Sequence, residues 1–360
     1  MDPKAFRTIH QIVRAARKNL DQTYWDYLIG GSDTETTMKR NRLSLDSIAL
    51  RPRILNDVSQ IDTSGMLLGE KLTIPVLLAP IGSLQMFEPG GGASAAKAAE
   101  EFGVINMLSS VCTPELEEVA RSSASRKIYQ LYVRGDADWT DEIVKRAIDS
   151  GYMGFCLTVD TALVSRRERD IAKNVQPTSQ SQQGGYEWQA RLNWKDVERI
   201  RRKFNIPLIL KGISRVEDAI KAVDMGIDVI YVSNHGGRQL DQGEGSIDVL
   251  PGIVNAVNGR AEIVVDGGFY RGTDIVKAMA LGANAVGLGR LEAWSLAAGG
   301  VPALVRCLKL LQNEIHLTLG LLGVTRFAEL DSSFVTKASP VVSPDVTSAF
   351  PLLSLEDTFY

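Results

Sequence analysis

The sequence has few of the residues that build metal sites and disulfide scaffolds. It contains three cysteines and three histidines in 360 residues. Cys112, Cys156 and Cys307 are far apart and follow no metal-ligand spacing, so we expect no metal and three reduced thiols in an intracellular protein. We expect a cytoplasmic location. The last residues carry no SKL-type signal, although a peroxisomal location in a eukaryote stays open.

Long apolar runs and an excess of charge of one sign are also missing. No run of about eighteen apolar residues occurs, so the sequence predicts no membrane span. Residues 1–20 are amphipathic and charged, which indicates a surface helix instead of a signal peptide. The net charge of -3 gives no sign of a nucleic-acid or membrane-surface partner. With 44% hydrophobic residues, the chain is expected to bury a large core.

From residue 70 onward, one pattern repeats eight times: a short apolar run, a turn, and an amphipathic helical segment. Near-continuous apolar strands alternating with helices indicate a parallel sheet covered by helices. Eight such units fit a closed (β/α)8 barrel better than an open doubly wound sheet. The runs are residues 74–80, 105–110, 127–133, 154–160, 207–212, 228–234, 262–268 and 285–290.

The barrel is expected to occupy residues 70–325. Residues 1–69 are predicted to form an N-terminal extension with one or two helices, packed on the barrel. Residues 326–360 are predicted to be a tail that wraps the surface or contacts another subunit. The polar segment 170–193 follows the fourth strand, and its Ser, Gln and Gly content predicts a mobile loop, either an active-site lid or passive disorder.

Polar residues gather at the carboxyl ends of the predicted strands, the face where barrel active sites form. A purely structural role would scatter such residues over both ends of the barrel, so the one-sided pattern favours a site. The residues are Gln130, Tyr132, Asp160, Lys211, Asn234, His235, Asp266 and Arg290.

The strongest local signal is SNHGGRQLD (233–241). Its glycines permit a sharp turn and a close approach to a ligand, which positions His235 as a base at the barrel mouth. The simpler interpretation is a buried structural histidine, the commoner role of a lone histidine. The strand-end position beside Gly-Gly-Arg favours the catalytic role.

Asp160 ends the fourth strand, where its carboxylate can hydrogen-bond a histidine and stabilise the imidazolium form. Arg166 and Arg167 follow in the loop. One of them, together with Arg238, can clamp a carboxylate through paired hydrogen bonds. At least one of the two adjacent arginines is expected to be a solvent-exposed charge only.

The last two strands end in glycine-rich segments, DGGFYRGTD (266–274) and GLGR (287–290). Each enters a helix and offers backbone N–H groups to an anion, and barrels commonly bind a phosphate at these two loops. The pair predicts a phosphorylated cofactor. Lys211, inside the apolar run PLILKG, either forms a Schiff base or places a positive charge beside a cofactor. Nothing else in the chain supports Schiff-base chemistry.

Taken in order, the motifs resemble those of the FMN-dependent 2-hydroxy acid oxidases and dehydrogenases, the family of glycolate oxidase, lactate oxidase and mandelate dehydrogenase. The resemblance runs from about residue 20 to about residue 325. It implies FMN as the cofactor and oxidation of an L-2-hydroxy acid to the 2-oxo acid, with O2 accepting electrons to give H2O2. The motifs are APIG (79–82), LSS (108–110), QLY (130–132), LTVDT (157–161), LKG (210–212), SNHGGRQLD (233–241), DGGFYRGTD (266–274) and GR (289–290).

The resemblance also implies roles for individual residues. His235 is the base, Asp160 its partner, and Tyr132 a further catalytic group. Tyr27, Tyr132, Arg167 and Arg238 bind the substrate. The implied cofactor contacts are Pro80, Ile81, Gly82, Ser109, Gln130, Thr158, Lys211, Ser233, Asp266, Gly267, Gly268, Tyr270, Gly289 and Arg290.

The chain departs from the family pattern at several positions. Tyr270 stands where the family usually has the first of two arginines, which helps bind phosphate, and Leu291 replaces a common proline. Val111 stands where many members have tryptophan, which predicts a wider pocket and a substrate bulkier than glycolate. Gly82 replaces the alanine of the glycolate-type oxidases, as in the mandelate and monooxygenase branches.

Alternatives on the same site are an FMN-dependent monooxygenase or oxidative decarboxylase and an electron-transferring dehydrogenase. Less favoured are an FMN-dependent isomerase, which needs a diphosphate site and a divalent metal, and a non-catalytic barrel. The resemblance also suggests a homo-oligomer, often a tetramer in this family.

Overall fold

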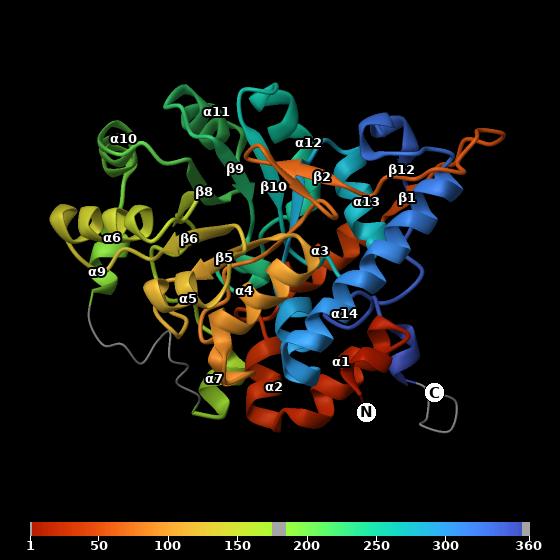
Figure 1. Cartoon of the computed structure of the whole chain (residues 1–360), viewed down its shortest axis with the longest axis horizontal. Helices are drawn as coiled ribbons and strands as arrows, with labels where there is room; N and C mark the ends of the chain where they lie inside the picture. Colours follow the sequence, from red (N-terminus) through yellow and green to blue (C-terminus); the bar gives the residue numbers. More distant parts are fainter. Residues whose placement is uncertain (1, 175–184, 355–360) are drawn as a thin grey trace.

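The computed structural model describes residues 2–174 and 185–354. Eight parallel strands close into a barrel with the order β10-β11-β4-β5-β6-β7-β8-β9, which confirms the predicted fold class (Figure 1). All eight predicted strands are present. They are β4 (Val76–Leu78), β5 (Ile105–Ser109), β6 (Lys127–Leu131), β7 (Gly154–Thr158), β8 (Leu208–Ile213), β9 (Val229–Val232), β10 (Glu262–Val265) and β11 (Ala285–Leu288).

The strands consist mainly of apolar residues, and their side chains are buried on both faces of the sheet. Every residue of β5, β6 and β7 is buried, as expected for parallel strands covered by helices. The register shifts between Lys211 and Ile213, where Gly212 has a φ of +113°. A Cβ at Gly212 would lie 2.6 Å from the Asp160 Cβ, so this bulge requires glycine and brings Asp160 close to Lys211.

Helices follow the strands in sequence and cover the barrel (Figure 1). Helix α6 illustrates why they form: the Asp136 side chain caps its first turn, and Ile143, Val144 and Ala147 face the barrel. The covering helices are α4 (Gly91–Phe102), α5 (Leu116–Ser122), α6 (Ala137–Asp149), α10 (Trp194–Lys203), α11 (Val216–Asp224), α12 (Ser246–Val257), α13 (Gly272–Ala280) and α14 (Arg290–Leu322).

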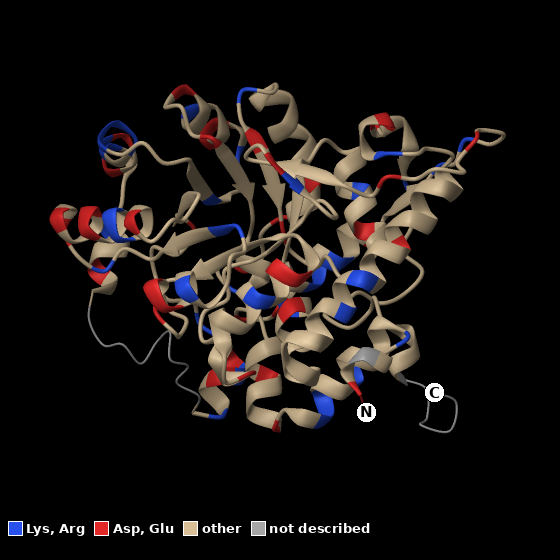
Figure 2. Ribbon diagram, in the orientation of Figure 1, with Lys and Arg blue, Asp and Glu red and all other residues tan. Residues whose placement is uncertain are grey.

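Helix α14 is long and apolar enough to cross a membrane by length and composition. It is kinked at Gly299 and Gly300 and packs against α1, α4 and α13, so most of its apolar surface is buried inside the protein. These contacts are those of a core helix. Acidic and basic residues are interspersed along the outer elements (Figure 2).

The N-terminal extension contains three α-helices, so the prediction of one or two was wrong. They are α1 (Ile9–Asn19), α2 (Gln22–Ile29) and α3 (Thr36–Asp46), preceded by the short turn η1 (Pro3–Ala5). The apolar face of α1 packs on α14. After α3, strands β2 (Gly65–Leu67) and β3 (Glu70–Leu72) form a hairpin whose Leu67 and Leu72 join the apolar cluster inside the barrel.

The segment after β7 is not only a loop. Helix α7 (Glu168–Ala172) overlaps its start and α9 (Tyr186–Arg191) lies near its end. The prediction of a loop was therefore wrong for the residues of these two helices. In α9, the side chain of Gln189 is buried and hydrogen-bonded to the barrel, which holds this helix in place. Residues 175–184, the centre of the predicted mobile loop, lie outside the described residues.

The C-terminal tail is tied to the body of the protein. Strand β12 (Val335–Lys337) pairs antiparallel with β1 (Ile48–Leu50), so a tail strand lies beside the segment that follows α3. Phe334 and Phe350, which lie before and after β12, are both buried. Short turns complete it: η4 (Phe327–Glu329), η5 (Ser332–Phe334) and η6 (Pro351–Ser354).

Candidate active site

A cavity of about 1360 Å³, counted with its open mouth, lies at the carboxyl ends of the barrel strands. Of the predicted substrate and cofactor residues, fifteen line it. Asp160, Ser109, Gln130, Thr158 and Ser233 stand behind the lining instead of on it. The lining residues are Tyr27, Pro80, Ile81, Gly82, Tyr132, Arg167, Lys211, His235, Arg238, Asp266, Gly267, Gly268, Tyr270, Gly289 and Arg290.

A strained turn carries His235 to the cavity. His235 itself has a φ of +59°, and Gly236 and Gly237 follow at +65° and +74°. A Cβ at Gly237 would lie 2.5 Å from the Met38 backbone, so this glycine permits α3 to pack against the turn. The Asn234 side chain accepts a hydrogen bond from the Gly237 N–H at 3.2 Å. This explains why the motif contains two glycines after the histidine.

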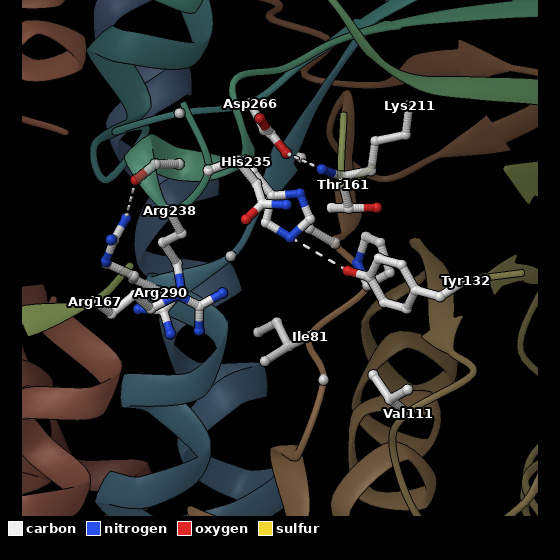
Figure 3. Close-up of a pocket in the computed structure, with 18 of the residues that line it drawn as sticks. Ile81, Val111, Tyr132, Thr161, Arg167, Lys211, His235, Arg238, Asp266 and Arg290 are labelled. Carbon is white, nitrogen blue, oxygen red and sulfur yellow. Dashed lines mark hydrogen bonds and ion pairs between the residues drawn. The ribbon is translucent and has the colours of Figure 1, made fainter. Parts of the chain in front are cut away.

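His235 lies between an acid and a phenol. Its Nδ1 is 3.1 Å from Asp160 Oδ1. Its Nε2 is 3.2 Å from the Tyr132 hydroxyl (Figure 3). A hydrogen on Nδ1 is then donated to the carboxylate, which leaves Nε2 free to accept a proton. Burial lowers the pKa of His235 below its ordinary value, although Asp160 opposes this. The imidazole is therefore neutral and can act as a base at neutral pH.

Asp160 is held as a carboxylate. Burial alone would raise its pKa. The positive charge that His235 carries when protonated, the hydrogen bond to His235 and the charge of Lys211 bring that pKa below its ordinary value. Its second oxygen, Oδ2, is buried without a hydrogen-bond partner in the described part of the chain. A negative charge fixed here stabilises a proton that His235 takes up.

Three guanidinium groups gather on one side of His235 (Figure 3). Arg238 donates to the carbonyls of Tyr27 at 2.7 Å and Gly30 at 2.8 Å, and it lies over the Tyr27 ring. Burial, together with the charges of Arg167 and Arg290, lowers the pKa of Arg238 to about 9. The cavity thus holds more positive than negative charge at this place, which favours binding of an anion.

The two adjacent arginines have different surroundings, as predicted. The Arg167 side chain is 14% exposed and lies 3.9 Å from Asp170, whereas the Arg166 side chain is 63% exposed and pairs with Glu168. Arg167 lines the cavity. It is therefore the arginine that can join Arg238 in a carboxylate clamp.

A buried hydrogen-bonded chain runs along the cavity wall from β8 to β10. Lys211 Nζ donates to Ser233 Oγ at 3.0 Å, and Ser233 donates to Asp266 Oδ1 at 2.6 Å. Burial alone would lower the pKa of Lys211, but Asp266 and Asp160 raise it above its ordinary value. Lys211 is thus a fixed cation inside the barrel mouth, beside the position expected for a cofactor ring.

Polar atoms without partners show that the site fits the polar edge of a flavin. Gln130 and Thr158 are fully buried, and both side-chain amide atoms of Gln130 and the Thr158 hydroxyl lack a hydrogen-bond partner among the residues described. An unsatisfied buried polar group costs about 1–3 kcal/mol. A bound ring with donors and acceptors on its edge would remove this cost. Ser109 instead accepts a hydrogen bond from the Val111 N–H at 3.4 Å.

The proposed phosphate end of the cavity combines glycines with one arginine. Gly267 and Gly268 have φ values of +103° and +83°, which turn the backbone sharply at the cavity wall. Arg290 donates to the carbonyls of Leu28, Gly30 and Gly236. Burial raises the pKa of Tyr270, and the nearby Arg290 charge opposes this rise. The set of backbone turns and one cation suits a phosphate monoester.

Sequence reasoning missed several residues that line the cavity. The Gln189 amide accepts from the Val133 N–H at 2.7 Å and donates to the Thr158 carbonyl at 2.8 Å, so it joins the ends of β6 and β7. Its polar, Gln-rich surroundings in the sequence gave no signal of burial. The other missed lining residues include Phe87, Arg134, Thr161, Leu163, Val164 and Tyr186.

Comparisons with known proteins show the family of this chain. The family model of the FMN-dependent dehydrogenases matches residues 16–337. L-lactate oxidase of Nostoc sp. is 40% identical over 347 residues, covering 89% of this chain and 95% of the relative. A peroxisomal (S)-2-hydroxyacid oxidase of Arabidopsis thaliana is 36% identical over 346 residues, covering 91% of this chain and 95% of the relative.

Solved structures agree with the sequence relatives. A crystal structure of mandelate oxidase with (S)-2-phenylpropionate aligns with a TM-score of 0.86 at 35% identity, covering 94% of this chain and 100% of that chain. A second mandelate oxidase structure, with benzoyl-formic acid, aligns with a TM-score of 0.87 at 35% identity over the same shares of the two chains. The chain therefore belongs to the FMN-dependent dehydrogenases, as an oxidoreductase of the 2-hydroxy acid oxidase family with FMN as its cofactor.

Proposed function

We propose that this enzyme oxidises an L-2-hydroxy acid to the corresponding 2-oxo acid, with O2 as the final acceptor and H2O2 as the second product. The observation that carries this proposal is the convergence of His235, Arg167 and Arg238 in one cavity, with Asp160 behind the histidine. FMN, when bound, supplies the two-electron acceptor for this oxidation.

The residues of this chain divide the remaining work. Arg167 and Arg238 hold the substrate carboxylate, which balances the surplus of positive charge among the guanidinium groups. His235 takes the proton of the substrate hydroxyl at Nε2, and Asp160 stabilises the resulting imidazolium. The Tyr132 hydroxyl lies beside the same nitrogen and orients the substrate oxygen.

Lys211 and the polar groups of β6 and β7 serve the cofactor in this proposal. The buried ammonium of Lys211 would stabilise negative charge on a reduced flavin. Gln130 and Thr158 would bond the polar edge of its ring, and Gly268 and Arg290 its phosphate. Pro80, Ile81 and Gly82 line the cavity where β4 passes into a loop, and they would lie alongside the ring.

The decisive experiment is anaerobic mixing of the holoenzyme with a panel of L-2-hydroxy acids while flavin absorbance is recorded. We expect rapid bleaching with at least one acid, and we expect His235→Ala to bind FMN yet lose bleaching by at least about 100-fold. Retained bleaching in the variant would rule out the histidine as the base.

The acceptor is tested by product analysis under oxygen. The proposal expects equal amounts of 2-oxo acid and peroxide. A shortened acid with carbon dioxide would identify a monooxygenase or oxidative decarboxylase. No turnover until an artificial electron acceptor is added would identify a dehydrogenase.

We further propose a substrate with a side chain larger than a hydrogen atom. Val111, Phe87 and Val164 form apolar parts of the cavity lining, and the small Val111 side chain leaves room beside Tyr132 (Figure 3). Comparing kcat/KM for glycolate with that for branched or aromatic 2-hydroxy acids tests the idea. A clear preference for glycolate would contradict it.

We also propose a cytoplasmic homo-oligomer. Ile54, Leu55 and Leu321 are 79%, 98% and 77% exposed. They lie close together, because the Arg53 N–H donates to the Leu322 carbonyl at 3.0 Å. Exposed apolar groups of this kind favour a subunit contact. Light scattering on Leu55→Asp and on the unaltered protein tests the contact, and a monomeric unaltered protein would exclude it.

A further inference from the structure

Near its described end, the C-terminal tail packs against Tyr270, which lines the proposed phosphate end of the cavity. Beyond β12, a turn in which the Thr347 N–H donates to Asp345 leads to Phe350, whose N–H donates to the Thr347 carbonyl at 2.8 Å. The Phe350 side chain is 1% exposed. Figure 1 shows this end of the chain beside α1. A tail residue buried to this degree occupies a specific site in the fold.

That site is a cluster of aromatic rings, defined here as His10, Tyr270, Trp294 and Phe350. The Phe350 ring lies 5.6 Å from Tyr270, 5.8 Å from Trp294 and 5.6 Å from His10, measured between ring centres. Tyr270 and Trp294 are 5.2 Å apart. These separations are typical of favourable aromatic pairs. The tail thus packs directly on Tyr270.

A backbone contact joins the tail to the residue after Tyr270. Arg271 donates to the Ala349 carbonyl at 3.4 Å and pairs with Glu314 of α14 at 2.6 Å. Glu314 also accepts from the Gly272 N–H at 2.7 Å. Arg271 therefore points to the tail and to α14, and does not line the cavity. Tyr270 does line the cavity, and it is the lining residue of this loop that the tail ring contacts.

Tyr270 connects the aromatic cluster to the cofactor cavity. It lines the cavity with Gly268 and Arg290. Arg42 covers its ring at 5.6 Å and donates to the Gly268 carbonyl at 2.6 Å. The ring therefore has the tail on one side and two arginines near its other edges.

We propose that Phe350 is a positioning residue for binding of the FMN phosphate. Phe350 acts by holding the Tyr270 ring where the Tyr270 hydroxyl can bond the phosphate. A phenol carries no charge, so it attracts a phosphate only through a hydrogen bond that is sensitive to distance and angle. The position of the Tyr270 ring depends on the side chains packed against it. The C-terminal segment 338–354 supplies one of these side chains, Phe350. The tail thereby contributes to cofactor affinity without touching the cofactor.

The experiment titrates the apoprotein with FMN and, separately, with riboflavin, which has the same ring but lacks the phosphate. We expect Phe350→Ala to weaken FMN binding about tenfold, in the range found when groups behind a ligand contact are removed, and riboflavin binding by less than about twofold. Phe334→Ala is the matched control. It truncates an equally buried tail aromatic that packs against Arg53 instead of the cluster, and it should change neither affinity.

A variant pair tests the route through the hydroxyl. In a Tyr270→Phe background, which lacks the proposed phosphate contact, Phe350→Ala should cause little further loss of FMN affinity. Equal weakening of FMN and riboflavin, an unchanged FMN affinity in folded Phe350→Ala, or additive losses in the double variant would each overturn the proposal. If Phe350→Ala fails to fold, Phe350→Leu keeps the apolar bulk, and the FMN-to-riboflavin ratio decides in the same way.

Discussion

His235 experiences two opposing influences, burial and the Asp160 carboxylate, which lower and raise its pKa. Replacing Asp160 with Asn removes the second influence, so the pKa of His235 should fall further. Because the base must be neutral in the free enzyme, the acidic limb of kcat/KM against pH should move to lower pH. The kcat should fall by at least about 100-fold, since the imidazolium loses its anionic partner. Steady-state kinetics from pH 4 to 9 measures both effects.

Asp228→Asn is the matched control for this prediction. Its carboxylate accepts from the Leu208 N–H at 2.8 Å at the start of β8, the opposite end of the barrel from the site. Its pH profile should equal that of the unaltered enzyme. An acidic limb of Asp160→Asn that stays in place or moves to higher pH would contradict the assignment of His235 as the base.

The adjacent arginines offer a second test at the scale of single residues. Arg167→Met removes a cavity-lining cation, so KM for the hydroxy acid should rise about 10- to 100-fold. This rise corresponds to the loss of one charge-assisted hydrogen bond, which contributes about 1.5–3 kcal/mol. Arg166→Met removes an exposed charge of the same type one position away and should change KM less than about twofold. Equal effects of the two variants would exclude a specific carboxylate contact for Arg167.

Single residues were predictable where a strand end fixes the direction of a side chain. His235, Lys211 and Asp266 follow directly from buried apolar runs, so their place at the barrel mouth could be read from the sequence. The residue pattern alone could not choose between Arg166 and Arg167, because that choice depends on contacts with Asp170 and Arg238 in the folded chain. Only the family resemblance pointed to Arg167. Gln189 was not predictable, since its partners Val133 and Thr158 are distant in sequence.

Helix α9 joins the segment after β7 to the active-site end of the barrel through Gln189. Gln189→Leu keeps much of the volume but leaves the Val133 N–H and the Thr158 carbonyl without partners, which should cost about 1–3 kcal/mol each. We expect a lower free energy of unfolding and a higher KM, because Tyr132 and Thr158 adjoin these groups. Denaturant unfolding and kinetics measure the two effects, with exposed Glu187→Gln on the same helix as control. An unchanged stability would show that the amide is dispensable.

Helices and strands could be predicted best where their pattern of apolar residues is long and regular. All eight barrel strands came from apolar runs, because parallel strands buried on both faces leave few other interpretations. Helix α9 has six residues and follows a polar stretch, so the local composition predicted a loop. The helix depends on tertiary contacts that the sequence does not reveal. The third helix of the N-terminal extension was missed in the same way: α3 begins within the turn-rich stretch 29–37.

At the scale of the whole molecule, the extension, the barrel and the tail act together on the site. Carbonyls at the end of α2 hold Arg238 and Arg290, Met38 of α3 packs against the turn after His235, and the tail covers Tyr270. The barrel mouth also keeps buried polar groups without partners in the described residues, above all Gln130 and Thr158. The protein is thus expected to be most stable with its cofactor, since FMN removes those costs on binding.

The contribution of the cofactor can be measured as stability. Ligand that binds only the folded state stabilises by about 2.7 kcal/mol at a free concentration of 100 times Kd, so FMN should raise the Tm of the apoprotein by several degrees. Thr158→Val removes one unsatisfied hydroxyl, so it should raise the apoprotein Tm while reducing the increase that FMN produces. A higher apoprotein Tm together with a smaller FMN increment would identify the Thr158 hydroxyl as a cofactor contact and not as a purely structural group. A variant that lowers the apoprotein Tm and keeps the full FMN increment would contradict the assignment of Thr158 to the flavin.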